Sequence, residues 1–320
     1  MKCILVLLSL LTLFQLKIRA QDEIHSTLFM MNKLLFNPAY AGSRDLTTIN
    51  ADYRNQWSAI KGAPTTLSAA VDGPVGNYNN YFREVAVGLS ISSEQIGVET
   101  KQIFTGYYAY RIRLKNESIL SFGLDGSAML YSANYSLLDP YQPNDPNLAR
   151  NIKSIMLPNF GAGLFWYSEN YYLGLAVPNL LQDYYDLSEK KINNLASREV
   201  RGYYLNGGYV FHVDEAFDLL PQFMARYIGN GTYQLPFNCD LNVSGIIAKK
   251  FLFGATYRTD KSFEAIVQMQ VTRNIFVGYA YDYLISALNG YNNGAHELIV
   301  GYDFVRGEAR NEPPHFAKLF

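Results

Sequence analysis

The stretch "NIFVGYAYDY", residues 274–283, decides the fold because its residues alternate in character at every position. One set is apolar and becomes aromatic towards its end: Ile275, Val277, Tyr279, Tyr281 and Tyr283. The other set is mainly polar, small or charged: Asn274, Phe276, Gly278, Ala280 and Asp282. A period of two residues is that of a β-strand with one apolar face.

The same alternation recurs along the chain and predicts an all-β protein. It is clear in "SFEAIVQMQVT" at 262–272 and in "HELIVGYDF" at 296–304. Marking such segments predicts about fourteen strands, within a range of 12–16, near 46–57, 64–73, 84–93, 101–113, 117–131, 157–168, 170–178, 200–212, 216–228, 236–249, 250–259, 262–272, 273–284 and 295–304. An even number of strands is typical of a bacterial single-chain barrel.

Alternation alone fits both a soluble β-sandwich and a transmembrane β-barrel, and three features favour the barrel. The segments are about 9–14 residues long, enough for a tilted membrane strand, whereas globular strands average about five or six. Tyr and Phe cluster near the strand ends, as in the aromatic girdles of membrane barrels. The last strand ends in Phe304, which resembles the C-terminal strand signal of outer-membrane barrels.

The connections also point to an outer-membrane barrel. Tight turns are predicted at 115–116, 168–170, 259–261 and 272–274, and long loops at 131–156 and 179–199. Short turns at one end and long loops at the other are typical of these proteins. We expect the first long loop to be irregular, and the second to have room for a helical turn.

The face opposite the apolar set carries charges that lipid would penalise, so we expect it to line the interior. These residues are Asp52, Arg54, Asp72, Asp125, Asp218, Arg226, Asp240, Arg258, Glu264, Asp282, Glu297 and Asp303. Mutual pairing that stiffens the barrel is the simplest role for each of them. We also place Phe104, Phe165 and Phe276 inside, with Gly88, Gly106, Gly123, Gly161, Gly174, Gly254, Gly278 and Gly301. Such glycines make room for a plug or for bulky inward aromatics, or allow strand curvature.

Composition and motifs point away from nucleic-acid binding and from catalysis. The formal net charge is -1 and charged residues make up 17% of 320 residues, which gives no basic surface for nucleic acid. Cys3 and Cys239 are the two cysteines, and the four histidines have no ligand spacing, so we predict no metal site. No Gly-x-Ser-x-Gly, P-loop or His-Glu-x-x-His motif is present. We therefore predict a non-enzyme with no catalytic residues and no cofactor.

The chain begins with features of a secretion signal. Residues 1–20 combine Lys2, an apolar run too short to span a bilayer, and Ala20 before the expected cut. The predicted organisation is a signal peptide at 1–20, an N-terminal segment at 21–45, a barrel at 46–304 and a polar tail at 305–320. We expect the N-terminal segment to be short, helical and plug-like, lying in the lumen or at the periplasmic rim.

Three pieces of the N-terminal region together resemble the PorP/SprF family of type IX secretion system membrane proteins of the Bacteroidota. They are Gln21-Asp22, "LFMMNKLLFNPAYAGS" at 28–43 and "YRNQW" at 53–57. The family motif falls here on Asn37, Pro38, Ala39, Tyr40, Ala41, Gly42, Arg54, Gln56 and Trp57. From their residue types, we expect Pro38 and Gly42 to serve chain geometry and not chemistry.

The resemblance implies an outer-membrane protein of the type IX secretion and gliding machinery that assists secretion or surface attachment of cargo proteins. Its implied partners are a cargo protein, secretion components and outer-membrane lipid. We place candidate partner contacts in the long loops, at Leu137, Tyr141, Tyr184 and Tyr185, although these side chains could equally pack loop on loop. The alternatives are a transport barrel, either a porin or a FadL-like carrier of hydrophobic compounds, and a purely structural barrel.

Overall fold

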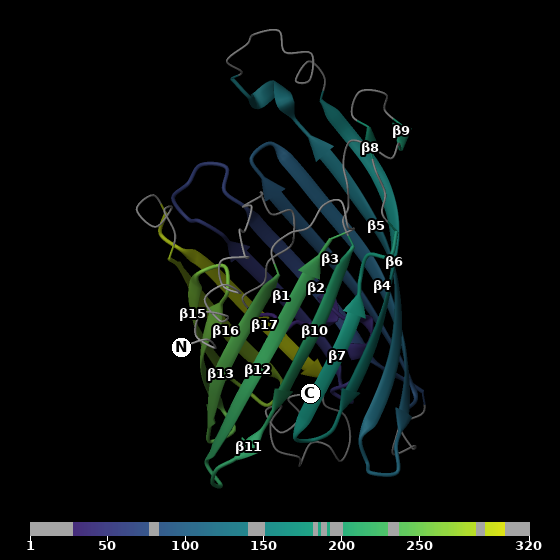
Figure 1. Ribbon diagram of the computed structural model, residues 1–320, viewed down its shortest axis with the longest axis vertical. Helices are drawn as coiled ribbons and strands as arrows, with labels where there is room; N and C mark the ends of the chain where they lie inside the picture. Colours follow the sequence, from purple (N-terminus) through teal and green to yellow (C-terminus); the bar gives the residue numbers. More distant parts are fainter. Residues whose placement is uncertain are drawn as a thin grey trace, which may run out of the picture.

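The protein folds as a closed antiparallel β-barrel of 14 strands, shown in Figure 1. The computed structural model describes residues 28–76, 83–139, 151–181, 185–186, 191–192, 201–229, 237–285 and 292–304. Each wall strand pairs with the wall strands before and after it in the chain, and β17 pairs with β1 to close the ring. The predicted fold class and strand number are therefore confirmed.

The wall strands coincide closely with the predicted segments. They are β1 (Thr47–Asn55), β2 (Thr65–Val75), β3 (Val85–Ile96), β4 (Glu99–Arg113), β5 (Ile119–Ala133), β6 (Ile152–Tyr167), β7 (Tyr171–Val177), β10 (Gly202–Tyr209), β12 (Phe217–Ile228), β13 (Asn238–Ile247), β14 (Phe251–Arg258), β15 (Ser262–Gln270), β16 (Ile275–Leu284) and β17 (Ala295–Phe304). Two two-residue strands were not predicted, β8 (Tyr185–Asp186) and β9 (Lys191–Ile192), which pair with each other. The predicted strand 200–212 is divided into β10 and the two-residue strand β11 (Phe211–His212), which pairs with β12.

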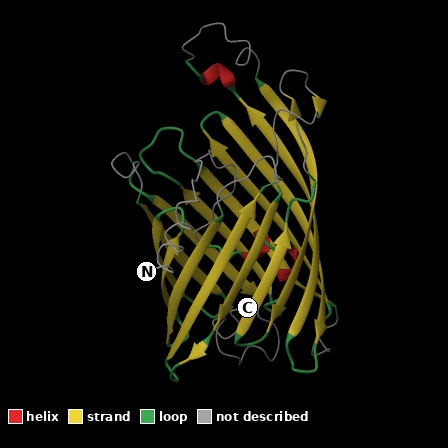
Figure 2. Ribbon diagram, in the orientation of Figure 1, coloured by secondary structure: helices red, strands yellow, loops and turns green. Residues whose placement is uncertain are grey.

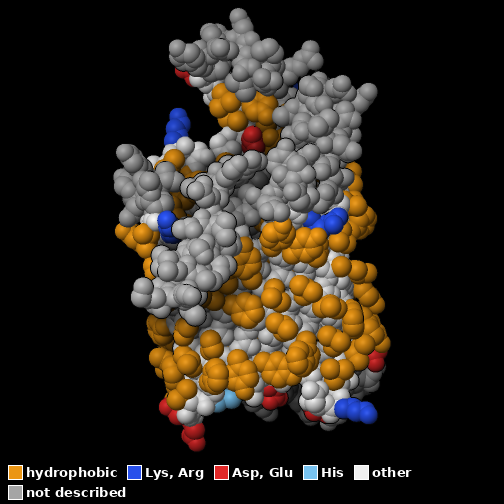
Figure 3. Space-filling model, viewed as in Figure 1, with side chains coloured by type: hydrophobic (Ala, Val, Ile, Leu, Met, Phe, Trp, Pro, Cys, Tyr) orange, Lys and Arg blue, Asp and Glu red, His pale blue; other side chains and the backbone are white. Residues whose placement is uncertain are grey.

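The sequence alternation sorts side chains between the lumen and the outer surface. On β15, buried and exposed residues alternate along the whole strand. Figure 3 shows apolar side chains gathered as a band around the visible wall. All twelve charged residues predicted to face inward are buried, each at 8% exposure or less. A closed barrel surrounded by lipid keeps its charges inside for this reason.

Two residues predicted to face inward lie on the outer face instead. Phe104 is 44% exposed, and Gly106 follows it on the same face of β4. The inner face of β4 is occupied by Tyr107, Ala109 and Arg111, which are buried. The register set by these three residues forces the intervening positions outward, because side chains alternate along a strand.

The two ends of the barrel differ in their connections. The turns after β4, β6 and β15 lie at the end where β1 begins and β17 ends, whereas the connections after β5 and β7 lie at the opposite end, which we call the long-loop end. The predicted turn at 259–261 joins β14 to β15 at the long-loop end, so tight turns are not confined to one side. Strand order alone dictates this, because consecutive antiparallel strands alternate in direction.

The wall is taller along β4, β5 and β6 than elsewhere, as Figure 1 shows. β6 has 16 residues and β7 has 7, and the last β6–β7 pair joins Ala162 to Val177. Residues 152–156, predicted to belong to an irregular loop, instead extend β6. They do so because β5 also continues: Tyr131 pairs with Ile155 and, after a shift in register, Ala133 pairs with Ile152.

The N-terminal segment, residues 28–45, lies inside the barrel. It contains two 3-10 helices, η1 (Lys33–Leu35) and η2 (Pro38–Tyr40), which Figure 2 shows within the ring of strands. Nearly all of its side chains are buried. Of the two locations that the sequence allows, the structure selects the lumen. The predicted signal peptide and C-terminal tail lie outside the described residues. In the described residues, no helix has both the length and the apolar character needed to cross a membrane.

Candidate functional site: the N-terminal motif in the lumen

The Asn37–Gly42 motif packs directly against the inner wall. Gly123 on β5 lies under η2, and a Cβ added there would collide with the backbone of Pro38 and Ala39. Gly163 on β6 lies under the Asn37 side chain in the same way. Two wall positions without side chains therefore form the surface on which the motif rests.

Asn37 is the polar anchor of this turn. Its Oδ1 accepts a hydrogen bond from the Ala39 N–H at 3.0 Å and so caps η2. Its Nδ2 donates to the Leu164 carbonyl at 3.0 Å, which ties the cap to β6. Pro38 occupies the first helical position, where its missing N–H costs nothing.

Tyr40 connects the motif to an aromatic cluster on the wall. Its ring meets Phe165 edge-on, with centroids 5.4 Å apart, and Phe165 in turn lies 5.6 Å from Tyr172. The Lys33 ammonium lies over the Tyr172 ring at 4.8 Å and donates to the Met30 carbonyl at 2.6 Å. A buried ammonium held by an aromatic face and a carbonyl retains partners for its charge.

Gly42 turns the chain towards β1. Its φ of 70° lies in the left-handed region, and an added Cβ would collide with Ala86 on β3. The Gly42 N–H donates to Asp72 Oδ2 at 2.7 Å, and its carbonyl accepts from Arg111 Nη1 at 2.5 Å. Arg111 also pairs with Asp45 Oδ1 at 2.8 Å. Both sides of this turn are thus fixed to inward-facing wall residues.

The start of the described segment is anchored nearer the long-loop end. Asn32 Nδ2 donates to Asp52 Oδ1 at 2.9 Å, and the Leu28 N–H donates to Glu297 Oε1 at 3.4 Å. Ser68 on β2 also donates to Asp52. Between Leu28 and Asp45, the segment therefore crosses much of the lumen, with anchors at both of its ends.

Arg54, another motif residue, belongs to a buried charge network on the inner wall. It pairs with Glu297 at 3.0 Å and with Asp282 at 3.2 Å. Because Glu297 also accepts from the Leu28 N–H, the network contacts the N-terminal segment.

The same network continues through Arg258. Its Nε lies 2.9 Å from Asp240 Oδ1, and its Nη2 lies 2.6 Å from Glu264 Oε1. A 3.6 Å contact to Asp282 links it to the Arg54 group, and Arg226 pairs with Asp240 at 3.0 Å. Buried charges need such partners, because leaving one unpaired is strongly destabilising.

Gln56 and Trp57 are not brought to the Asn37–Gly42 motif. β1 ends at Asn55, two residues before the predicted end, and both side chains are half-buried in the following loop at the long-loop end. Trp57 has a φ of 50°, which does not fit a strand. The Gln56 N–H donates to the Pro64 carbonyl at 2.9 Å, so these residues shape the β1–β2 loop.

Of the predicted contact residues, Leu137 is clearly placed. It ends the 3-10 helix η3 (Tyr135–Leu137) at the long-loop end and is 72% exposed. Tyr185 lies in the short strand β8, with only its backbone described. Tyr141 and Tyr184 lie outside the described residues.

The sequence did not identify several residues that hold the segment, namely Asn32, Lys33, Arg111, Leu164 and Tyr172. The inward glycines were the available signal. Gly88 and Gly123 make room for the segment, and Gly301 makes room for the Phe276 ring. Two of the three roles expected for such glycines are therefore seen, namely room for the N-terminal segment and room for an inward aromatic ring. In the described ranges, no group of three or more His, Cys, Asp or Glu side chains could hold a metal ion.

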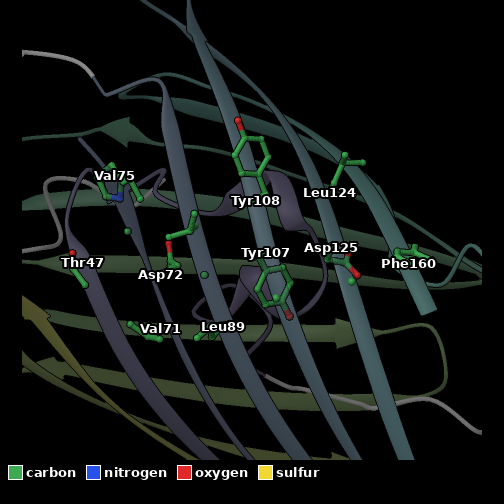
Figure 4. Close-up of a pocket in the computed structure, with 16 residues that line it drawn as sticks. Thr47, Val71, Asp72, Val75, Leu89, Tyr107, Tyr108, Leu124, Asp125 and Phe160 are labelled. Atoms are coloured by element: carbon green, nitrogen blue, oxygen red, sulfur yellow. The ribbon is translucent and has the colours of Figure 1, made fainter. Parts of the chain in front are cut away.

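A groove of about 710 Å³ crosses the wall over β2–β6 (Figure 4). Its outward-facing lining is apolar, with Leu89, Tyr108, Leu124 and Phe160 exposed around it. The depression forms where Gly106 on β4 pairs with Gly126 on β5, because neither residue has a side chain to fill it. The lining also includes the buried residue Asp72, which accepts the Gly42 N–H, so the groove adjoins the N-terminal motif.

Comparison with known proteins places the sequence in a family. A family model described as "Type IX secretion system membrane protein PorP/SprF" matches residues 18–302. No curated protein matches the chain.

Solved structures of low sequence identity are also similar to the chain. The outer membrane protein Omp33 of Acinetobacter baumannii shares 10% identity over 81% of this chain and 98% of that chain, with a TM-score of 0.45. The NanC porin shares 13% identity over 81% and 100%, with a TM-score of 0.39. A mutant Rh. blastica porin shares 8% over 81% and 99%, with a TM-score of 0.34.

Proposed function

Because the chain belongs to the PorP/SprF family of type IX secretion system membrane proteins, we propose that this outer-membrane barrel is a non-enzymatic scaffold that assists secretion or surface attachment of cargo proteins. The observation that carries the proposal is the position of the N-terminal segment. Residues 28–45 fill part of the lumen and are hydrogen-bonded to the wall near both of their ends. A lumen occupied by its own chain favours binding at the rims over passage of a substrate.

The two rims offer different surfaces for the two kinds of partner. In outer-membrane barrels the short turns face the periplasm and the long loops face outward. We assign secretion components to the end where β1 begins, and cargo to the long-loop end, where Leu137 is exposed. Exposed apolar residues at a rim are available for protein contacts.

Affinity purification with one variant at each rim tests this assignment. The full-length protein, Leu137→Ser and Leu114→Ser are purified from outer membranes, and co-purifying proteins are quantified by mass spectrometry. Leu114 is the matched control, because it is an exposed leucine in the turn after β4, at the opposite end. Leu137→Ser should lower recovery of exported cargo, whereas Leu114→Ser should leave it unchanged. Recovery of neither cargo nor secretion components with the unaltered protein would refute the proposal.

The transport alternative makes a different prediction for the purified barrel. A porin needs a continuous polar path, and the segment bonded to Asp52, Asp72 and Glu297 crosses that path. Steady single-channel conductance of the unaltered protein would favour the alternative over the scaffold.

A further inference from the structure

In the part of the chain that the structure describes, β6 has no partner strand on one side beyond the end of β7. β5 pairs with β6 as far as Ile152, but β7 pairs with it only from Ala162 to Tyr167. The Leu180 N–H bonds the Phe160 carbonyl at 2.8 Å, which covers the first residues past β7. The β8–β9 ladder pairs with itself. Among the described residues, no strand pairs with residues 152–158 on the side away from β5. We call this side of residues 152–158 the β6 edge.

The direction of the backbone groups on this edge follows from the Phe160 bond. In a strand, the N–H and C=O of one residue point to the same side, and successive residues alternate. The register with β5 is regular from Tyr167 to Ile155, so the backbone of Met156 and Pro158 points the same way as that of Phe160. Met156 therefore presents an N–H and a C=O to the open side, and Pro158 presents a C=O.

We infer that the β6 edge binds an extended segment of another polypeptide as an added strand. Open strand edges are templates for pairing, and strand addition is an established mode of peptide recognition. Pro158 removes one donor and so marks where the added ladder weakens, near the closed part of the wall. Exposed Met156 and buried Leu157 lie on opposite faces, so side chains of an added strand would alternate between the outer surface and the barrel mouth.

The added strand would come from the cargo protein, and in this one respect the inference rests on the proposed function. The position fits that source, because the β6 edge lies at the long-loop end and extends past the neighbouring β7. Recognition through backbone groups would also tolerate cargo segments of different sequence, because the hydrogen bonds between paired strands do not involve side chains.

Two substitutions at one position separate backbone from side-chain recognition. Met156→Pro deletes the open-side N–H without removing a bond to β5, and Pro158 shows that a proline fits the same side of this strand. Met156→Ala removes the side chain and keeps the N–H. Surface proteins that depend on this barrel are first defined with a deletion strain and then quantified in both variants. We expect those proteins to fall about tenfold with Met156→Pro and to remain unchanged with Met156→Ala.

Equal behaviour of the two variants would overturn the inference, whether both keep the surface proteins or both lose them. Amide hydrogen exchange of the unaltered protein gives an independent measurement that does not require a variant to fold. The Met156 amide should exchange about tenfold more slowly in native outer membranes than in the purified protein. Equal rates would refute strand addition by a partner, and slow exchange already in the purified protein would mean that the chain itself or a second copy covers the edge. A deletion strain with an unchanged surface would refute the proposed function alone, because the exchange result would still decide the edge.

Discussion

At the residue scale, the inner wall is organised by charge pairs that only the strand register brings together. The alternation of the sequence was enough to predict that Arg54 and Glu297 face inward. It could not predict that they meet, because this depends on their lying opposite each other in the β1–β17 register. The same holds for Asp240 and Arg258, which are partners across β13 and β14. The burial of a charged side chain follows from the local alternation of the sequence, whereas its ion-pair partner is set by the pairing of strands that are distant in the chain.

Arg258→Met is expected to destabilise the barrel strongly. The substitution keeps much of the buried stem but deprives Glu264 of the Arg258 cation, while Asp240 keeps its pair with Arg226; breaking a buried pair costs about 3–5 kcal/mol. The urea midpoint of unfolding in detergent, followed by the heat-modifiable gel shift, should fall. Arg113→Met is the control, because the Arg113–Glu117 pair is exposed and worth about 0–1 kcal/mol. Equal midpoints for the two variants would contradict this reading of the network.

Gly42→Ala is expected to loosen the N-terminal segment for two reasons that can be separated. A positive φ costs an alanine about 1–2 kcal/mol, and its Cβ would also press on Ala86. Gly97→Ala is the matched control, since Gly97 has a φ of 58° but open space around the added Cβ. Protease cleavage within residues 28–45 should rise for Gly42→Ala and stay at the unaltered level for Gly97→Ala. Cleavage that rises equally in both would mean that the effect does not depend on the place of Gly42 in the segment.

At the element scale, strands were predicted well and the non-repetitive segment poorly. A strand such as β15 can be predicted from the alternation of apolar and polar residues within it, so its bounds differ from the prediction by only two residues. Segment 28–45 has no such period, and its position is set by empty sites on distant strands, such as Gly123 and Gly163. The early start of β6 was missed for a related reason, because residues 152–156 become a strand only through pairing with β5.

Gly123→Val is expected to displace η2 while leaving the barrel closed. The added side chain would occupy the space of Pro38 and Ala39 on the inner face, and valine is well suited to a strand. Gly106→Val is the control, since Gly106 lies on the outer face, where an added Cβ has Leu89 as its near neighbour at 3.8 Å. Labelling of an Ala39→Cys residue by a water-soluble maleimide should increase with Gly123→Val and remain slow with Gly106→Val. Slow labelling in both would mean that the turn does not depend on the Gly123 surface.

At the scale of the whole molecule, the barrel combines a wall made for lipid with a lumen made for its own chain. The outward apolar band and the inward charges suit the barrel to the outer membrane. We expect the segment across the lumen to determine whether the molecule conducts ions. The unaltered protein should show no steady conductance in a planar bilayer if the segment, which is bonded to Asp52, Asp72 and Glu297 across the lumen, closes the path for ions.

Gly123→Val should convert the non-conducting barrel into a conducting one if the N-terminal segment blocks the lumen. The wall keeps its strands, and displacing η2 frees inward polar groups that include Asp72 and Arg111, both of which bond Gly42 in the intact protein. Single-channel recording of the variant, compared with the unaltered protein and with Gly106→Val, measures the change directly. Conductance confined to Gly123→Val would assign the block to the segment. If none of the three proteins conducts although Gly123→Val increases maleimide labelling of Ala39→Cys, the block lies elsewhere in the lumen. The position of the segment would then no longer support the scaffold function.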